Sequence, residues 1–475
     1  MKRFSSALLM LSLLLASNLG ALAQQQQEIN FGELEKVVLE ELKETRTPGA
    51  AIAIVSGNRI VYAKGFGVAN VETNVPVTPD MLFRIASVTK MFTATALVHM
   101  AEQGKLKLNE PIGTYVKGLS PRLSELTTHQ LLTHTSGIVN DAQRGGRRGE
   151  SALADAVRSW TDNAMFFEQP GKVYSYSNPG LTLAGFVLQE AGQKPYAEMM
   201  STLLFKPLGM KLTTFRTTLA MTYPLSMGHD FGEDKRPVVV RPYPDDQEFL
   251  PAGGMISSVT DLARFAIAFM NDGRVDGQQV LSPSAISKLT TPYVDSHNAA
   301  GEWRQGYGMR MTSYRGVRVV EHLGGTNGFG SQLRMIPEHR FAVIILANSS
   351  LAQMKKTTEK AMELMLPLQP KPANMPEASL PLSAAEMSNF TGTYQNGPLR
   401  FQVFVKDNRL RLKVGEDEVA LKKVGERLLS IDEREEDATA ESALFKNMLM
   451  IPGTDGKTEY LYFTGRALKR VSAAK

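Results

Sequence analysis

The segment FRIASVTKMFTATALVHM, residues 83–100, predicts a buried helix that is preceded by a serine. From Met91 to Met100 it is apolar on nearly every face, which is typical of a helix buried inside a domain. Ser87 lies at the N-terminus of this helix, and Lys90 follows three positions later on the same face. A serine hydroxyl needs a base to act as a nucleophile. A lysine amine among apolar neighbours has a lowered pKa and can be that base. The spacing therefore predicts a nucleophile, Ser87, beside its base, Lys90.

This spacing alone leaves a structural alternative open. Ser472 and Lys475 have the same spacing at the end of the chain, where we expect no site. A serine that caps a helix and a lysine on the surface would produce the same pattern. The hypothesis therefore needs support from other parts of the chain.

A second candidate motif is Tyr176-Ser-Asn178, which we place on a loop leading into an apolar helix over residues 181–188. A tyrosine hydroxyl near a cationic lysine ionises more easily and can move protons. The Asn178 amide can bind a substrate carbonyl. The structural alternative is a packing tyrosine and a turn asparagine.

The third candidate motif, His322-Leu-Gly-Gly325, follows a predicted strand over residues 317–321 and is expected at its end. Gly324 and Gly325 would let a substrate backbone lie against the edge of the sheet. The backbone N–H groups of Gly325 and Ser87 could form an oxyanion hole. The alternative for His322 is an ordinary histidine at the end of a strand.

Three motifs follow one another along the chain: serine-x-x-lysine, tyrosine-x-asparagine and a basic residue before x-glycine. In this order they resemble the serine β-lactamase and penicillin-binding-protein superfamily. The chain is most similar to the branch of class C-like β-lactamases, D-alanyl-D-alanine carboxypeptidases, D-aminopeptidases and related esterases. The similarity covers about residues 30–365. Three further stretches share it: residues 131–137, 207–210 and 251–258.

The resemblance implies a role for each residue of the three motifs. Ser87 would be acylated, Lys90 would be its base and Tyr176 would relay protons. Asn178 would hold the substrate amide, and His322 replaces the lysine that meets the carboxylate of a β-lactam in typical β-lactamases. That replacement weakens a β-lactamase interpretation more than a hydrolase interpretation. The predicted catalytic residues are Ser87, Lys90 and Tyr176, and the predicted substrate-binding residues are Asn178, His322, Gly324 and Gly325.

Strand-like runs at both ends of the resembling region predict how the domain is built. Residues 50–55 and 60–62 are typical of a hairpin, and residues 317–321, 332–336 and 341–347 of further strands. The segments between them are mostly helical. We expect an α/β fold of the α+β type, an antiparallel sheet flanked by helices plus an all-helical region, as the resemblance also implies.

The remaining chain divides into three further parts. Residues 1–23 combine Lys2 and Arg3, an apolar run too short to span a bilayer and a small-residue cleavage site, which predicts a signal peptide. The hydrolase domain is then expected over residues 24–366. Prolines in residues 367–376 predict a linker. Short alternating runs in residues 377–475 predict a small antiparallel barrel or sandwich, and the resemblance implies an appended β-barrel.

Composition excludes several classes of function. The 475 residues contain no cysteine, which removes disulfides, thiolate metal sites and cysteine nucleophiles. The net charge of +5 is small for this length and does not indicate a surface that binds nucleic acid. The seven histidines show no metal-binding spacing. We therefore expect no cofactor, no metal, no nucleic-acid partner and no stable membrane insertion.

The sequence as a whole predicts an exported serine hydrolase, periplasmic or extracellular, that cleaves an amide or ester through an acyl-enzyme. Its substrate would be a D-amino-acid peptide, a β-lactam or a small ester. One alternative is a true β-lactamase or a peptidoglycan D,D-carboxypeptidase. Another is a non-catalytic receptor that keeps the pocket without turnover. The oligomeric state is left open.

Overall fold

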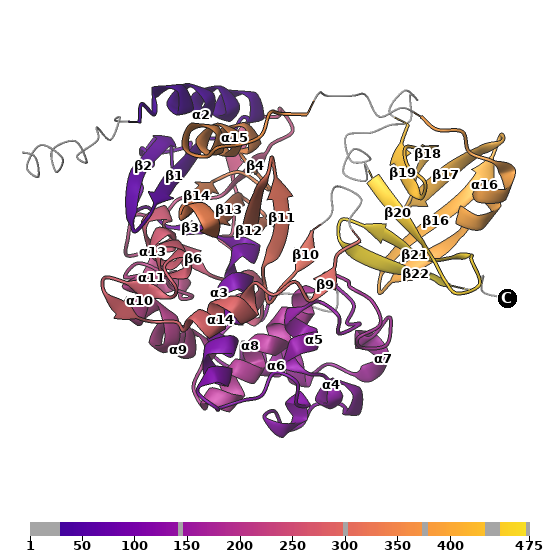
Figure 1. Ribbon diagram of the computed structural model, residues 1–475, viewed down its shortest axis with the longest axis horizontal. Helices are drawn as coiled ribbons and strands as arrows, with labels where there is room; N and C mark the ends of the chain where they lie inside the picture. Colours follow the sequence, from indigo (N-terminus) through magenta and orange to yellow (C-terminus); the bar gives the residue numbers. More distant parts are fainter. Residues whose placement is uncertain (1–28, 141–145, 298–302, 373–378, 433–446, 472–475) are drawn as a thin grey trace, which may run out of the picture.

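The computed structural model describes residues 29–140, 146–297, 303–372, 379–432 and 447–471. These residues form a large domain of sheet and helices and a smaller barrel beside it (Figure 1). The predicted fold class is thereby confirmed. The predicted signal peptide lies outside the described residues.

The large domain is organised around one eight-stranded antiparallel sheet of order β2-β1-β14-β13-β12-β11-β10-β9. The N-terminal hairpin pairs through β1 with β14, so that Ile52 lies opposite Ile345 and the two ends of the domain meet in one sheet, as predicted. Central strands of this kind are buried on both faces and need continuous apolar runs. The strands are β1 (Gly49–Ser56), β2 (Arg59–Gly67), β9 (Val294–Asp295), β10 (Arg304–Gln305), β11 (Arg310–Tyr314), β12 (Val317–Thr326), β13 (Phe329–Ile336) and β14 (Phe341–Ala347).

Helices cover both faces of this sheet. On one face α2 (Gly32–Thr45) and α15 (Lys355–Met365) lie side by side (Figure 1). Leu34, Val38 and Met362 from these helices belong to one buried cluster with alternate residues of β1 and β14. On the other face α13 (Val259–Met270) packs against β1 and β14.

Helix α3 (Thr89–Glu102) is the predicted buried helix, and every residue from Thr89 to Val98 is buried. It packs against α8 (Asn178–Gly192), α12 (Leu250–Gly253) and α14 (Pro283–Leu289). The predicted all-helical region lies below the sheet in Figure 1. Its other helices are α4 (Pro121–Glu125), α5 (Thr128–Leu132), α6 (Ala152–Arg158), α7 (Asp162–Met165) and α9 (Tyr196–Met200).

The C-terminal domain is a closed antiparallel barrel of eight strands with α16 (Ala384–Phe390) beside it. Alternation places Phe401, Val403, Leu410 and Leu412 inside, as the sequence pattern predicts. The strands are β15 (Gly392–Asn396), β16 (Leu399–Lys406), β17 (Arg409–Val414), β18 (Asp417–Lys423), β19 (Leu428–Ile431), β20 (Asn447–Pro452), β21 (Thr458–Phe463) and β22 (Arg466–Val471).

The barrel docks onto the large domain through Glu168, whose side chain is only 3% exposed. Lys469 of β22 forms an ion pair with this carboxylate at 2.8 Å, and the Tyr460 hydroxyl donates to it at 2.5 Å. The Tyr462 hydroxyl also donates to the Tyr174 carbonyl at 3.0 Å. A buried carboxylate with charged and neutral donors ties the two domains together.

Replacing Glu168 with glutamine is expected to loosen this docking. Burial raises the pKa of Glu168, but hydrogen bonds from Lys469 and Tyr460 outweigh it and bring the pKa to about 2. The loss of a charged acceptor should lower the free energy of unfolding by about 1–3 kcal/mol at pH 7. Thermal melting of Glu168→Gln and wild type measures this difference.

The effect should depend on pH in a defined direction. A carboxylate with a lowered pKa contributes its full stability above its ordinary value of 4.5, and loses it as pH falls through the folded value of about 2. The two melting curves should therefore converge as pH falls through that range. Glu459→Gln, which removes a more exposed partner of Lys172, serves as the control. An equal loss in both variants would contradict the role of Glu168.

Candidate active site

Ser87 lies in the short connection between a strand and α3. Strand β3 (Phe83–Arg84) leads into a short 3-10 helix, η1 (Ala86–Val88), and α3 follows directly. Ala86 has a φ of 44°, in the left-handed region that side chains other than glycine seldom adopt. Local backbone strain of this kind concentrates at functional sites. The predicted position of Ser87 at the start of the buried helix is what the structure shows.

Lys90 is fully buried and its amine contacts Ser87. Its Nζ donates to the Ser87 hydroxyl oxygen at 3.0 Å and to the Ala252 carbonyl at 2.6 Å. Burial lowers the pKa of Lys90, and the charges of Arg310 and Arg466 lower it further, against a raising effect of Tyr176. A neutral amine is therefore accessible at lower pH than for an exposed lysine, as a base for Ser87 requires.

Tyr176 approaches Ser87 from the loop before α8. Its hydroxyl lies 2.9 Å from the Ser87 hydroxyl oxygen, and the centre of its ring lies 5.0 Å from the Lys90 amine. Burial raises the pKa of Tyr176, but the Lys90 charge and hydrogen bonds with Lys90 and Ser87 outweigh it and leave the pKa below its ordinary value. Ser87 is thus in hydrogen-bond range of two groups that can exchange its proton.

The loop that carries Tyr176 is fixed from both ends. The Ser177 hydroxyl caps α8 by accepting from the Gly180 N–H at 3.1 Å. The Ser177 N–H donates to Nδ1 of His134 at 3.1 Å, and the His134 ring packs on the Tyr176 ring with centroids 4.6 Å apart. His134 lies just after the end of α5. Its contact with the Tyr176 loop has no signal in the sequence.

The barrel also reaches this loop. The Tyr176 N–H donates to the Gly465 carbonyl, in the turn between β21 and β22, at 2.9 Å. The guanidinium of Arg466 lies 5.3 Å from the Tyr176 ring centre, and that of Arg310 on β11 lies 5.9 Å from it. Sequence analysis did not identify these residues, because they come from segments with no recognisable motif. Together with Lys90 they make the surroundings of Tyr176 electropositive.

His322 lies inside β12, which continues to Thr326. The prediction that the strand ends before His322 is therefore wrong. Gly324 and Gly325 continue to pair with Ser331 and Gly330 of β13, so these glycines extend the strand instead of ending it.

His322 is a neutral side chain. Burial, with the charges of Arg310 and Lys90, holds its pKa well below the ordinary value. Nδ1 lies 2.7 Å from the Leu323 carbonyl, which can only accept, so Nδ1 carries the proton. A neutral imidazole cannot supply the positive charge of the lysine that His322 replaces in the comparison with typical β-lactamases.

Gly324 permits β12 to approach η1 closely. A Cβ at this position would lie 2.1 Å from the Ser331 hydroxyl oxygen and 2.4 Å from the Ile85 carbonyl oxygen, both far too close. Ser331 itself donates to that carbonyl at 2.6 Å and so links β13 to the same turn. The backbone contact between the strand and the serine turn requires glycine.

Gly324→Ala is accordingly expected to displace β12 from the Ser87 turn. A shift of about 1 Å in a catalytic constellation can cost about 100-fold in rate, and a loss of that order in kcat/KM is expected. Steady-state kinetics on the best substrate found for the wild type gives the value. Gly232→Ala, whose added Cβ would meet only a Val238 methyl at 3.2 Å and more distant atoms, is the control. Unchanged kinetics in Gly324→Ala would refute the close-approach argument.

A cavity of about 230 Å³ opens beside Ser87. Asn178, the first residue of α8, and Gly325 of β12 line it together with Ser87, so the structure brings these three predicted residues to one space. Tyr176 and His322 are not among its lining residues. The other lining residues are Arg84, Ala86, Pro244, Asp246, Phe249, Ala252, Gly253 and Thr326.

The described residues contain no group of three or more histidine or acidic side chains placed to hold a metal ion. None of the helices in the described ranges has both the length and the apolar composition that crossing a bilayer requires.

Curated relatives match most of the large domain. Protein flp of Staphylococcus aureus (strain MW2) is 26% identical over 337 residues, covering 69% of this chain and 65% of flp. The match therefore spans less than two thirds of the length of that relative. Penicillin-binding protein 4 of Amycolatopsis lactamdurans is 28% identical over 327 residues, covering 65% of this chain and 83% of the relative.

Solved structures match the barrel as well. A crystal structure of SurE superposes with a TM-score of 0.75 at 24% identity, covering 92% of this chain and 98% of that chain. At this identity the match shows only that the two chains share a fold. An octameric penicillin-binding protein homologue from Pyrococcus abyssi superposes with a TM-score of 0.64 at 26% identity, covering 93% and 100%. The family model described as Beta-lactamase matches residues 34–364, well over half of the chain. The chain belongs to the beta-lactamase family.

Proposed function

We propose that the protein is a serine hydrolase that cleaves an amide or ester bond through an acyl-enzyme on Ser87. The observation that carries the proposal is the position of the Ser87 hydroxyl oxygen, 3.0 Å from the buried Lys90 amine and 2.9 Å from the Tyr176 hydroxyl. Nucleophilic catalysis by serine requires such a neighbouring base. A structural serine would not require a lysine amine buried beside it.

The proposed reaction has two steps. Ser87 gives its proton to the Lys90–Tyr176 pair and attacks the carbonyl carbon, and the developing oxyanion accepts from the N–H groups of Ser87 and Gly325. The leaving group takes the proton from the pair and departs. A water molecule, deprotonated by the same pair, then attacks the acyl-enzyme and restores the Ser87 hydroxyl.

A β-lactamase or a D,D-carboxypeptidase is the second candidate, supported by the name of the penicillin-binding protein that the chain resembles. The neutral state of His322 argues against efficient β-lactam hydrolysis, because a β-lactam carboxylate gains more from a cation. A peptidase or esterase activity is therefore the preferred form of the proposal. D-amino-acid peptides and small esters are the substrates to test first.

One labelling experiment tests the proposal. The purified protein is incubated separately with a fluorescent penicillin and with a fluorophosphonate, and the modified peptide is identified by mass spectrometry. We expect an adduct on Ser87 with the fluorophosphonate, and slow penicillin turnover. Rapid penicillin turnover would favour the β-lactamase. No adduct on Ser87 with either reagent would favour a receptor that binds without catalysis.

Export is a separate part of the proposal. Residues 1–23 support cleavage before Gln24, with the mature protein in the periplasm or outside the cell. Expression of the full chain in a bacterial host, followed by fractionation and mass measurement of the intact product, tests it. Retention of Met1 in a cytoplasmic product would contradict this part and leave the proposed chemistry standing.

A further inference from the structure

Arg84 is a buried cation in the wall of the active-site cavity. It is the last residue of β3, three positions before Ser87, and only 7% of its surface is exposed. One guanidinium nitrogen, Nη1, donates to the Pro244 carbonyl at 2.6 Å. Its Nε is buried and has no hydrogen-bond partner. A guanidinium is charged at every accessible pH, so burial cannot remove this charge.

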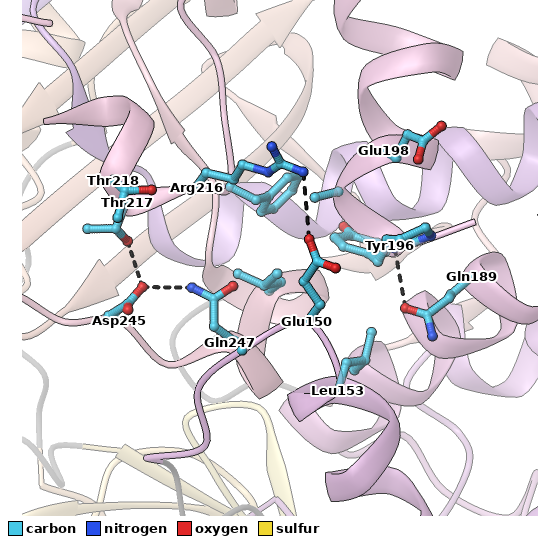
Figure 2. Close-up of a pocket in the computed structure, with 15 residues that line it drawn as sticks. Glu150, Leu153, Gln189, Tyr196, Glu198, Arg216, Thr217, Thr218, Asp245 and Gln247 are labelled. Carbon is cyan, nitrogen blue, oxygen red and sulfur yellow. Dashed lines mark hydrogen bonds and ion pairs between the residues drawn. The ribbon is translucent and has the colours of Figure 1, made fainter. Parts of the chain in front are cut away.

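No carboxylate among the described residues lies within 4.0 Å of the Arg84 guanidinium. Two acids on the neighbouring segment, Asp245 and Asp246, act on Arg84 only at longer range: burial lowers the pKa of Arg84, and the charges of these acids partly offset that effect. Their hydrogen bonds come from other groups. Asp246 accepts from the Gly146 N–H at 2.8 Å. Asp245 turns to a second cavity on the other side of the segment, where it accepts from Thr217 and Gln247, both at 2.8 Å or less (Figure 2).

The second cavity differs from the first in charge. Figure 2 shows Glu150, Glu198 and Asp245 around it with Arg216, which forms an ion pair with Glu150. The active-site cavity is lined by one basic residue, Arg84, and one acidic residue, Asp246, and no carboxylate among the described residues lies within ion-pair distance of Arg84. Buried charges in proteins are normally paired, so an unpaired guanidinium facing a cavity points to an anion that arrives with the ligand.

The position of the cavity shows which half of a substrate would meet Arg84. A leaving group must depart on the side of the Lys90–Tyr176 pair, which protonates it. Tyr176 does not line the cavity, whereas Ser87 and Asn178 do. The half of the substrate that stays on Ser87 therefore extends into the cavity toward Arg84.

We propose that Arg84 binds a carboxylate on the acyl half of the substrate, so that the enzyme prefers esters or amides of dicarboxylic acids or of acidic amino-acid residues. This inference rests on the proposed acyl-enzyme at Ser87. Guanidinium and carboxylate form paired, charge-assisted hydrogen bonds, and the enclosed setting strengthens them. Arg84 is then a residue that determines specificity, distinct from the residues that carry out the reaction.

Two esters of nearly equal size test the inference: mono-p-nitrophenyl glutarate and p-nitrophenyl valerate. In both, Ser87 displaces p-nitrophenolate and water then releases the acid. Wild type is expected to show at least about tenfold higher kcat/KM for the glutarate ester, through a lower KM. Arg84→Gln should lose this preference, so that the ratio of its kcat/KM on glutarate to its kcat/KM on valerate falls to about one.

Arg216→Gln is the matched control, since its side chain is exposed and does not line the active-site cavity. It should keep the preference. Equal kcat/KM on both esters in wild type would overturn the inference and leave the hydrolase proposal intact, and this comparison needs no variant that must fold. A parallel loss on both esters in Arg84→Gln would also overturn it, by assigning Arg84 a structural role. Turnover of neither ester, with no adduct on Ser87, would overturn the proposed function itself.

Discussion

Ser87→Ala is expected to abolish turnover, with a fall in kcat on the order of 10⁶ as for other serine hydrolases that lose the nucleophile. The variant retains Lys90, Tyr176 and the cavity, so substrate binding should persist while no covalent intermediate can form. Alanine lacks only the hydroxyl oxygen, which in the wild type lies between the Lys90 amine and the Tyr176 hydroxyl. The fold should therefore remain intact.

Two measurements check this outcome together. Steady-state hydrolysis gives the loss of rate, and treatment with a fluorophosphonate should leave the protein unmodified at position 87. Ser287→Ala, on the exposed side of α14, controls for the loss of a serine hydroxyl elsewhere. Wild-type turnover in Ser87→Ala would remove the basis of the proposed mechanism, whatever the geometry of the site.

Lys90→Met is expected to lower kcat/KM by about 10²- to 10⁴-fold, the range for loss of a general base. Methionine keeps an apolar chain of similar length in the buried position and removes only the amine. Acylation by the fluorophosphonate should slow in parallel, because the Ser87 hydroxyl loses the group that accepts its proton. Lys105→Met, an exposed lysine just beyond the end of α3, is the matched control.

The pH dependence of the wild type supplies a second test of Lys90. Burial lowers the pKa of the amine below its ordinary value of 10.5, so the neutral form persists to lower pH. Protonation removes the base, so kcat/KM should fall as pH falls through that lowered pKa, which belongs to the Lys90–Tyr176 pair. This acid limb should be absent from the residual activity of Lys90→Met. A limb that survives there would assign the titration to another group.

Features that depend on short stretches of chain could be predicted from the sequence. The helical repeat alone places Ser87 and Lys90 on one face, since positions three apart are neighbours on any helix. The hairpin formed by β1 and β2 and the strand β14 follow from apolar runs bounded by turns. The buried surroundings that lower the pKa of Lys90 were likewise predicted from the apolar residues that follow it.

Features that bring distant segments together were decided by the tertiary structure. Tyr176 contacts Ser87 across 89 positions of sequence, and the Gly465 carbonyl of the barrel holds the Tyr176 backbone. The course of β12 past His322 depends on pairing with β13, which no local pattern of glycines reveals. The unpaired charge of Arg84 depends on where the chain from Pro244 onward is packed. Spacing along one helix is encoded locally, whereas these contacts exist only after the sheet, the helices and the barrel have packed, because packing determines which distant side chains share a buried space.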